Sequence, residues 1–180
     1  MSWLAGPYLA TAVLLVVAGG PKVAQPDSAV RALASVRWAA WRTLVRLLGL
    51  VEVLIGLAAL LIGGPVPAVL MGVSYAAFSC FVTLALLRGG VLSSCGCFGK
   101  ADTPPTHTHL AVTLCSAVIA LAVAARPIGP SLAVMQSTPA AGLPLLGFAA
   151  LGVWFSYLLL AVLPHSSGRA IARAAEVRRT

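Results

Sequence analysis

Two of the four cysteines, Cys95 and Cys97, are separated by a single glycine in the stretch SSCGCFGK, residues 93–100. A Cys-Gly-Cys segment closes a disulfide only through a small ring, which departs from the geometry that disulfides prefer and makes the bond easier to reduce. Gly96 supplies the backbone freedom for that closure, and the nearby Lys100 favours the thiolate form of the pair. The spacing therefore favours thiol–disulfide exchange over a permanent structural bridge.

A metal site is the alternative chemistry for the same segment. PTHTHL follows the cysteines, so Cys95, Cys97, His107 and His109 form a C-x-C and H-x-H set. Thiolate and imidazole ligands of this kind suit zinc or copper. Without a metal, His109 is expected at the start of a helix or as a proton-transfer partner of the thiols, and His107 in a solvated loop.

The elements that must position these groups are membrane helices. The chain has 180 residues, of which 60% are hydrophobic and only 9% charged, and its mean hydropathy is +1.00. A helix needs about 20 apolar residues to cross a bilayer, and five runs approach that length. We expect an all-α, polytopic membrane bundle of about five transmembrane helices, a four-helix core plus one, forming a single domain over residues 1–180. The runs are Trp3–Gly19, Leu44–Gly63, Val66–Leu87, Thr108–Ala125 and Leu143–Leu163.

Positive charge is distributed unequally between the two sides of this arrangement. With five spans, Arg126 alone of the 12 Lys and Arg residues falls on one side. The positive-inside rule therefore places the N-terminus outside and both the cysteine segment and the basic tail, residues 164–180, in the cytoplasm. The basic segment 21–43, which includes Lys22, is expected to lie in the membrane interface. Nothing resembles a nucleic-acid-binding module, so the net charge of +8 does not indicate such a partner.

One carboxylate falls within a predicted span. Glu52 lies roughly 12 Å from the start of the second run. A carboxylate at that depth is costly, so we expect it to face the bundle interior as a functional group that takes up protons or binds a polar ligand. The alternative is a structural hydrogen bond to Thr83, Ser79 or Tyr75.

The other two cysteines also fall within predicted spans. Cys80 and Cys115 lie at similar depths, roughly 10 to 12 Å from the same face of the membrane. They form a second pair that exchanges with the first, or they are small hydrophobic residues in a helix interface.

Several of these stretches together resemble the methylamine utilisation protein MauE family and the broader DoxX-like group. They are CGCFG with the histidine-containing helix start that follows it, AGGPKVAQP at the end of the first span, and LGLVEVLIGL in the second. The resemblance covers roughly residues 14–120. It implies a multi-pass, redox-associated membrane protein that assists maturation of the disulfide-rich β-subunit of methylamine dehydrogenase, or that acts with a thioredoxin-like protein.

On matching positions, the resemblance implies that Cys95 and Cys97 are the redox pair, and it extends to Lys22, Glu52 and His109. The resulting hypothesis is a thiol–disulfide oxidoreductase of the bacterial cell membrane, in which Glu52 and His109 assist proton movement. The alternatives are a metal-handling membrane protein and a non-catalytic scaffold of a maturation complex. No cofactor motif is present in the sequence, and a quinone or a metal remains open.

Overall fold

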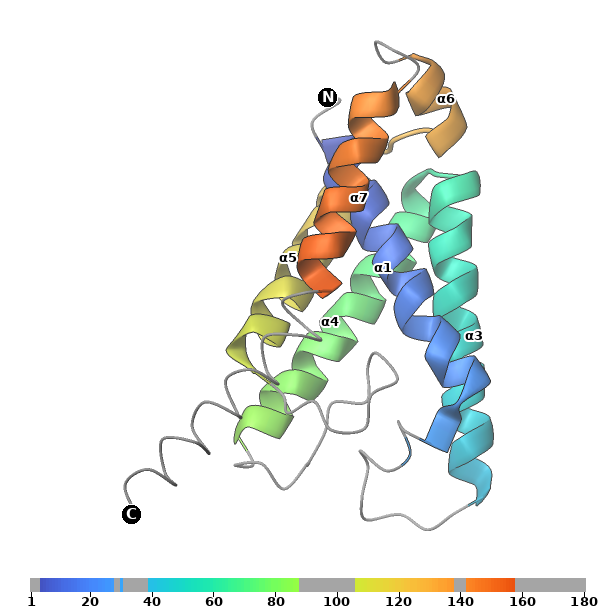
Figure 1. Ribbon diagram of the computed structural model, residues 1–180, viewed down its shortest axis with the longest axis vertical. Helices are drawn as coiled ribbons and strands as arrows, with labels where there is room; N and C mark the ends of the chain where they lie inside the picture. The colour runs from blue at the N-terminus through green and yellow to red at the C-terminus, as the bar shows by residue number, and fades with distance from the viewer. Residues whose placement is uncertain (1–3, 28–29, 31–38, 88–105, 138–141, 158–180) are drawn as a thin grey trace, which may run out of the picture.

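The computed structural model describes residues 4–27, 30, 39–87, 106–137 and 142–157, and the regular structure within these ranges is helical (Figure 1). The helices join into one elongated bundle. They are α1 (Ala5–Ala24), α3 (Ala39–Leu61), α4 (Pro65–Leu87), α5 (His107–Ala125), α6 (Ser131–Gln136) and α7 (Leu143–Tyr157).

Four of the helices are long and apolar enough to cross a bilayer: α1, α4, α5 and the part of α3 from Trp41 to Leu61. They match the first four predicted spans, so the prediction of a multi-pass helical membrane protein is confirmed. The fifth predicted span begins correctly at Leu143. Its helix α7 is described for 15 residues, to Tyr157, and the remainder of that run lies outside the described residues.

The end of the first span differs from the prediction. The Gly-Gly-Pro sequence at 19–21 suggested a break after Gly19, but α1 continues through Pro21 to Ala24. Proline inside a helix removes one backbone hydrogen bond, and helix packing in a membrane tolerates this loss. Lys22 is therefore part of α1, and residues 39–43 are part of α3. The ends of the predicted interfacial segment 21–43 thus belong to spanning helices, while most of its centre and the tail 164–180 lie outside the described residues.

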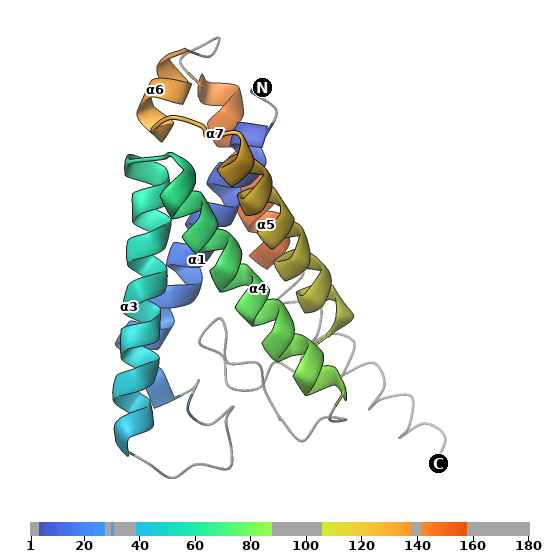
Figure 2. The same ribbon diagram turned by 180° about the vertical axis from the view of Figure 1, so that it is seen from behind.

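Helix α1 is the central element of the bundle. It packs most extensively on α3 and also contacts α7 and α5, while α4 packs along α5 (Figures 1 and 2). A tight turn after α3 leads into α4, with Gly63 and Gly64 at φ angles of 67° and 85° that favour glycine. Gly64 N–H donates to the carbonyl of Ile128 at 2.9 Å, so this turn is tied to the chain that leaves α5.

The contact between α1 and α3 follows a regular stripe on α3. The stripe on α3 alternates steps of four and three residues, the spacing of a seam with a 3.5-residue period. Its buried residues are Val45, Gly49, Glu52, Gly56 and Ala59. Helix α1 is buried on several sides, and the residues that lie against this stripe include Ala12, Val16, Gly19 and Lys22.

Glycines allow the two backbones to approach closely at this seam. A Cβ atom on Gly19 would lie 2.6 Å from the carbonyl oxygen of Gly49, and one on Gly49 would lie 2.7 Å from the Cβ of Lys22. Gly56 lies equally close to Val16 and Ala12 of α1. Small residues that let helices approach are typical of membrane interfaces, where van der Waals packing drives association.

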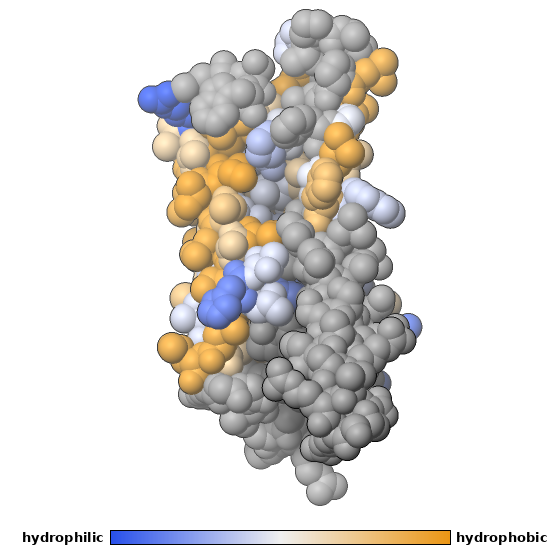
Figure 3. Space-filling model, turned by 60° about the vertical axis from the view of Figure 1, so that its left-hand side comes forward, coloured by the Kyte–Doolittle hydropathy of each residue, from blue (hydrophilic) through white to orange (hydrophobic). Residues whose placement is uncertain are grey.

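The large apolar side chains outside these contacts face outward. Leu47, Leu54, Val73, Val118 and Leu151 are among those that are about half exposed or more. Figure 3 shows hydrophobic residues over much of one face of the bundle. This distribution fits a lipid-facing surface around a core of small residues and a few large ones such as Leu15 and Met71.

The close α1–α3 crossing predicts that alanine substitution destabilises the protein at only one of two neighbouring glycines. Gly19→Ala places a methyl group against the backbone of Gly49, and we expect a loss of about 1–3 kcal/mol in the free energy of unfolding. Gly20→Ala is the matched control, because a Cβ there meets nothing within 4 Å. Thermal unfolding in detergent should show a lower midpoint for Gly19→Ala only, and equal midpoints for the two variants would contradict the crossing.

Candidate functional site

A buried ion pair joins α1 to α3. Lys22 Nζ donates to both carboxylate oxygens of Glu52, at 2.7 Å to Oε1 and 2.6 Å to Oε2. The two residues are 6% and 1% exposed. Glu52 thus lies in the bundle interior as expected, but its hydrogen-bond partner is Lys22 rather than Thr83, Ser79 or Tyr75.

The ammonium group of Lys22 has an aromatic neighbour from a third helix. It lies 4.6 Å from the ring centroid of Phe78 on α4, within the range of a cation–π interaction. Phe78 packs edge-on against Tyr75, with ring centroids 6.0 Å apart. The Tyr75 hydroxyl in turn donates to the carbonyl of Thr11 on α1 at 2.6 Å. The ion pair is therefore enclosed by α1, α3 and α4.

This pairing limits what the carboxylate can do. An ammonium group has three N–H donors, and Lys22 directs hydrogen bonds to both oxygens of Glu52 while the Phe78 ring lies close by. The pair has no net charge, which lowers the cost of placing both groups within a span. Proton uptake by Glu52 leaves Lys22 as an unpaired buried cation, so any proton step there is coupled to separation of the pair.

His109 lies in the first turn of α5, as predicted for a helix-start residue. Thr106 caps this helix, and its hydroxyl accepts from the His109 backbone N–H at 3.3 Å. The same hydroxyl is 2.7 Å from His109 Nδ1, in a hydrogen bond whose direction depends on the imidazole tautomer. His109 is 3% exposed, whereas His107 is exposed at the helix end.

Hydrogen bonds also tie α5 to α4 near this histidine. Ser79 Oγ donates to Thr113 Oγ1 at 2.9 Å across the two helices. Thr113 Oγ1 is itself within hydrogen-bond distance of the His109 carbonyl, at 3.0 Å. Helices α4 and α5 are the two elements that flank the cysteine segment, and these contacts hold them together.

The predicted redox pair, Cys95 and Cys97, lies in residues 88–105, outside the described residues. That segment connects the C-terminal end of α4 to the N-terminal end of α5. Both of these ends lie at the end of the bundle where α1 finishes and α3 begins (Figures 1 and 2). The Lys22–Glu52 pair is therefore in the half of the bundle that also holds the C-terminal end of α4 and the N-terminal end of α5.

Cys80 and Cys115 are both free thiols with exposed side chains. They lie on the outward faces of α4 and α5, and the interface between those helices is formed by other residues. Cys80 and Cys115 are therefore not joined by a disulfide in this structure. Among the described residues there is also no group of three or more potential metal ligands, and two of the four residues of the metal alternative lie outside them.

A groove between α1 and α7 has a volume of about 480 Å³. Trp154 on its wall and the neighbouring Phe155 are each about 60% exposed, as expected for lipid-facing aromatic residues. The groove suits a hydrocarbon chain and offers no charged side chain to a quinone headgroup. Its walls are formed by Val13, Leu14, Val17, Leu146, Ala149, Ala150, Val153 and Trp154.

Sequence reasoning did not find the Lys22–Glu52 contact or the role of Phe78. Lys22 was expected in a loop, since the glycines and proline before it suggested the end of a helix. The available signal was the stripe spacing: Lys22 lies three residues after Gly19, and Glu52 three residues after Gly49. Packing of the two glycines against each other brings those positions together.

The ion pair predicts a strongly non-additive pair of substitutions. Lys22→Met and Glu52→Gln each leave a buried partner unpaired, and we expect each single variant to lose about 3–5 kcal/mol of unfolding free energy. The double variant leaves no unpaired charge and should be closer to the wild type than either single variant. A double-mutant cycle measured by unfolding in detergent tests this, and additive losses would contradict the pairing. Arg42→Gln is a control, because its ion pair with Asp27 is exposed.

Comparison with known proteins identifies the family. The family model described as Methylamine utilisation protein MauE matches residues 2–126, which include the Lys22–Glu52 pair, the cysteine segment and His109. Neither the curated proteins nor the solved structures gave a match. The matched region covers α1, α3, α4 and α5 and more than half of the chain. This multi-pass membrane protein therefore belongs to the methylamine utilisation protein MauE family.

Proposed function

We propose that this protein is a membrane thiol–disulfide redox protein whose Cys95–Gly96–Cys97 segment assists disulfide formation during maturation of a partner protein. The observation that carries the proposal is the Cys-Gly-Cys spacing within the region matched by the family model. The family description refers to methylamine utilisation. A partner consistent with that description is the disulfide-rich β-subunit of methylamine dehydrogenase.

The proposed exchange conserves electrons and protons. A partner thiolate attacks the Cys95–Cys97 disulfide and forms a mixed disulfide, and a second partner thiolate then releases the two cysteines as a dithiol. The partner loses two electrons and two protons in total. The disulfide of a thioredoxin-like protein regenerates the pair by the same exchange in reverse order.

The anchoring of the segment supports this role. Its two flanking helices are tied by the Ser79–Thr113 hydrogen bond, and the α5 end is fixed by the Thr106 cap. A redox segment with fixed ends can be approached by a partner without large movement of the membrane helices. The buried His109 is twelve residues after Cys97 in the sequence, at the start of the helix that follows the cysteines, and we propose that it relays protons released by the thiols.

Glu52 has a different proposed role from a freely titrating base. Because Lys22 holds both of its oxygens, we propose that Glu52 assists proton movement only when the pair separates. In the resting state the pair fixes α1 against α3. Loss of the pair should therefore impair function through both structure and proton transfer.

Trapping tests the redox role directly. Cys97→Ser leaves Cys95 without its resolving thiol, so we expect a mixed disulfide with a partner, seen as a larger band on non-reducing gels that collapses with reductant. Mass spectrometry of that band identifies the partner. Cys80→Ala combined with Cys115→Ala is the matched control and should leave trapping intact. If Cys97→Ser forms no adduct in cells that express the partner, the redox proposal is wrong.

Labelling in intact cells tests the proposed orientation. The charge distribution places Cys95 and Cys97 at the cytoplasmic face. In the Cys80→Ala, Cys115→Ala background, a membrane-impermeant maleimide added outside intact cells should therefore not react with them, whereas lysed cells should be labelled. In this orientation the proposed exchange takes place before the partner is exported. Labelling from outside would reverse the orientation and place the pair on the side of exported partners.

A further inference from the structure

One positive charge on α3 has no acidic partner in the part of the chain that the structure describes. Lys22 pairs with Glu52, and Arg42 pairs with Asp27 at 2.7 Å. Arg46 belongs to neither pair and is exposed on the outer surface of the bundle. The two pairs cancel in charge, so the described charged residues at this end of α1 and α3 leave one net positive charge, on Arg46.

Arg46 lies inside the apolar part of α3. The spanning part of this helix begins at Trp41, which places the Cα atom of Arg46 roughly 7 Å farther along the helix axis. Its neighbours Leu47 and Leu48 are about half exposed, as expected of lipid-facing residues. An arginine at this depth is costly unless it pairs with a negative group or extends to the membrane interface. Helical side chains lean toward the N-terminal end, so the backbone directs this guanidinium toward the headgroups.

An apolar stripe continues from Arg46 along the outer face of α3. Leu50, Leu57 and Leu61 follow it by about one, three and four helical turns, so they lie near the same face. These leucines are 45%, 39% and 71% exposed. From Leu50 to Leu61 the stripe is roughly 16 Å long, about half of the hydrocarbon thickness of a bilayer. A cation followed by one leaflet's depth of apolar surface matches the two parts of a phospholipid, its phosphate and its acyl chain.

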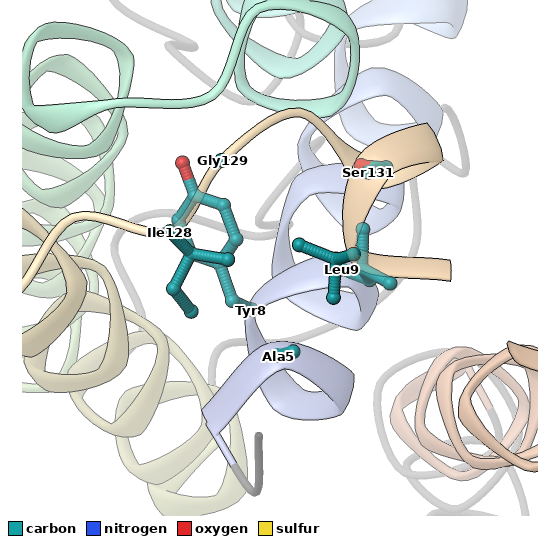
Figure 4. Close-up of a pocket in the computed structure, with 7 residues that line it drawn as sticks. Ala5, Tyr8, Leu9, Ile128, Gly129 and Ser131 are labelled. Atoms are coloured by element: carbon teal, nitrogen blue, oxygen red, sulfur yellow. The ribbon is translucent and has the colours of Figure 1, made fainter. Parts of the chain in front are cut away.

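Two other places in the described residues suit a lipid less well. The groove between α1 and α7 is wide enough for an acyl chain, but no charged side chain lines it. The cavity beside Tyr8 and Ile128 (Figure 4) is also without charged residues, and its volume of about 10 Å³ is too small for a lipid chain. Only the outer face of α3 combines a cation without a described partner with exposed aliphatic side chains.

We propose that Arg46 and the leucine stripe of α3 bind one anionic phospholipid. The guanidinium makes charge-assisted hydrogen bonds to the phosphate, for which its planar shape is suited. One acyl chain lies along Leu50, Leu57 and Leu61. A zwitterionic lipid carries its own ammonium group beside the phosphate, whereas an anionic lipid supplies the one negative charge that the described residues lack. The site therefore favours an anionic headgroup.

Native mass spectrometry of the full-length protein in detergent tests this site, because it counts individual bound lipids. The probes are phosphatidylglycerol and phosphatidylcholine with the same acyl chains. We expect the wild type to bind the first phosphatidylglycerol more tightly than phosphatidylcholine. Arg46→Gln should weaken phosphatidylglycerol binding about five-fold, the usual effect of one basic residue near anionic lipid, and leave phosphatidylcholine binding unchanged. Unchanged preference for phosphatidylglycerol in Arg46→Gln would overturn the proposal.

Two further variants separate the site from overall charge and from loss of structure. Arg126→Gln removes the same charge at the other end of the bundle, beyond α5, and should keep the preference for phosphatidylglycerol. An equal loss in Arg126→Gln and Arg46→Gln would show attraction to net charge alone and reject the site. Arg46→Lys keeps the charge and should retain most of the preference, and a loss as large as that of Arg46→Gln contradicts charge pairing.

Free phosphate is the other source of the same anionic group. Inorganic phosphate in large excess should not displace phosphatidylglycerol from the wild type, because the acyl chain also contacts the leucine stripe. Displacement by inorganic phosphate would show a small-anion site and overturn the assignment to a lipid.

Discussion

The Lys22–Glu52 ion pair is the interaction that constrains the rest of the bundle. Two opposite charges within a membrane are tolerated when they meet at hydrogen-bond distance, and here both Nζ–O distances are below 2.8 Å. Such contact requires α1 and α3 to approach closely along the same stripe. The glycines at 19, 49 and 56 permit that approach. The ion pair in this protein therefore depends on the close packing of α1 against α3.

The remaining helices are organised around that central contact. Helix α4 supplies Phe78 beside the Lys22 ammonium and Tyr75 to the α1 backbone, so it is joined to the α1–α3 pair by aromatic side chains. Helix α5 is joined to α4 by the Ser79–Thr113 hydrogen bond. The chain between α4 and α5 carries the Cys-Gly-Cys pair. These contacts link the buried charges to α4, and α4 to the first turns of α5, the helix that follows the proposed redox segment.

Apolar run length was enough to predict the first four spans, because hydrocarbon thickness sets helix length directly. The inward orientation of Glu52 and the helix-start position of His109 also followed from local arguments, the cost of a charge in lipid and the start of an apolar run at Thr108. The partner of Glu52 did not, since Lys22 lies 30 residues away in the sequence and only packing brings them together. The exposure of Cys80 and Cys115 likewise depends on how α4 and α5 are rotated about their axes.

The regular seam between α1 and α3 has a consequence for how sequences of this fold can change. Each residue added to or removed from a helix turns everything beyond it by about 100°. A single-residue insertion between Gly49 and Glu52 would carry the carboxylate from the seam toward lipid, whereas exchanging one aliphatic residue for another on the outward face leaves the register intact. Aliphatic substitution on the outer surface should therefore cost little stability. The number of residues between Gly19 and Lys22 on α1, and between Gly49 and Glu52 on α3, cannot change without separating the ion pair.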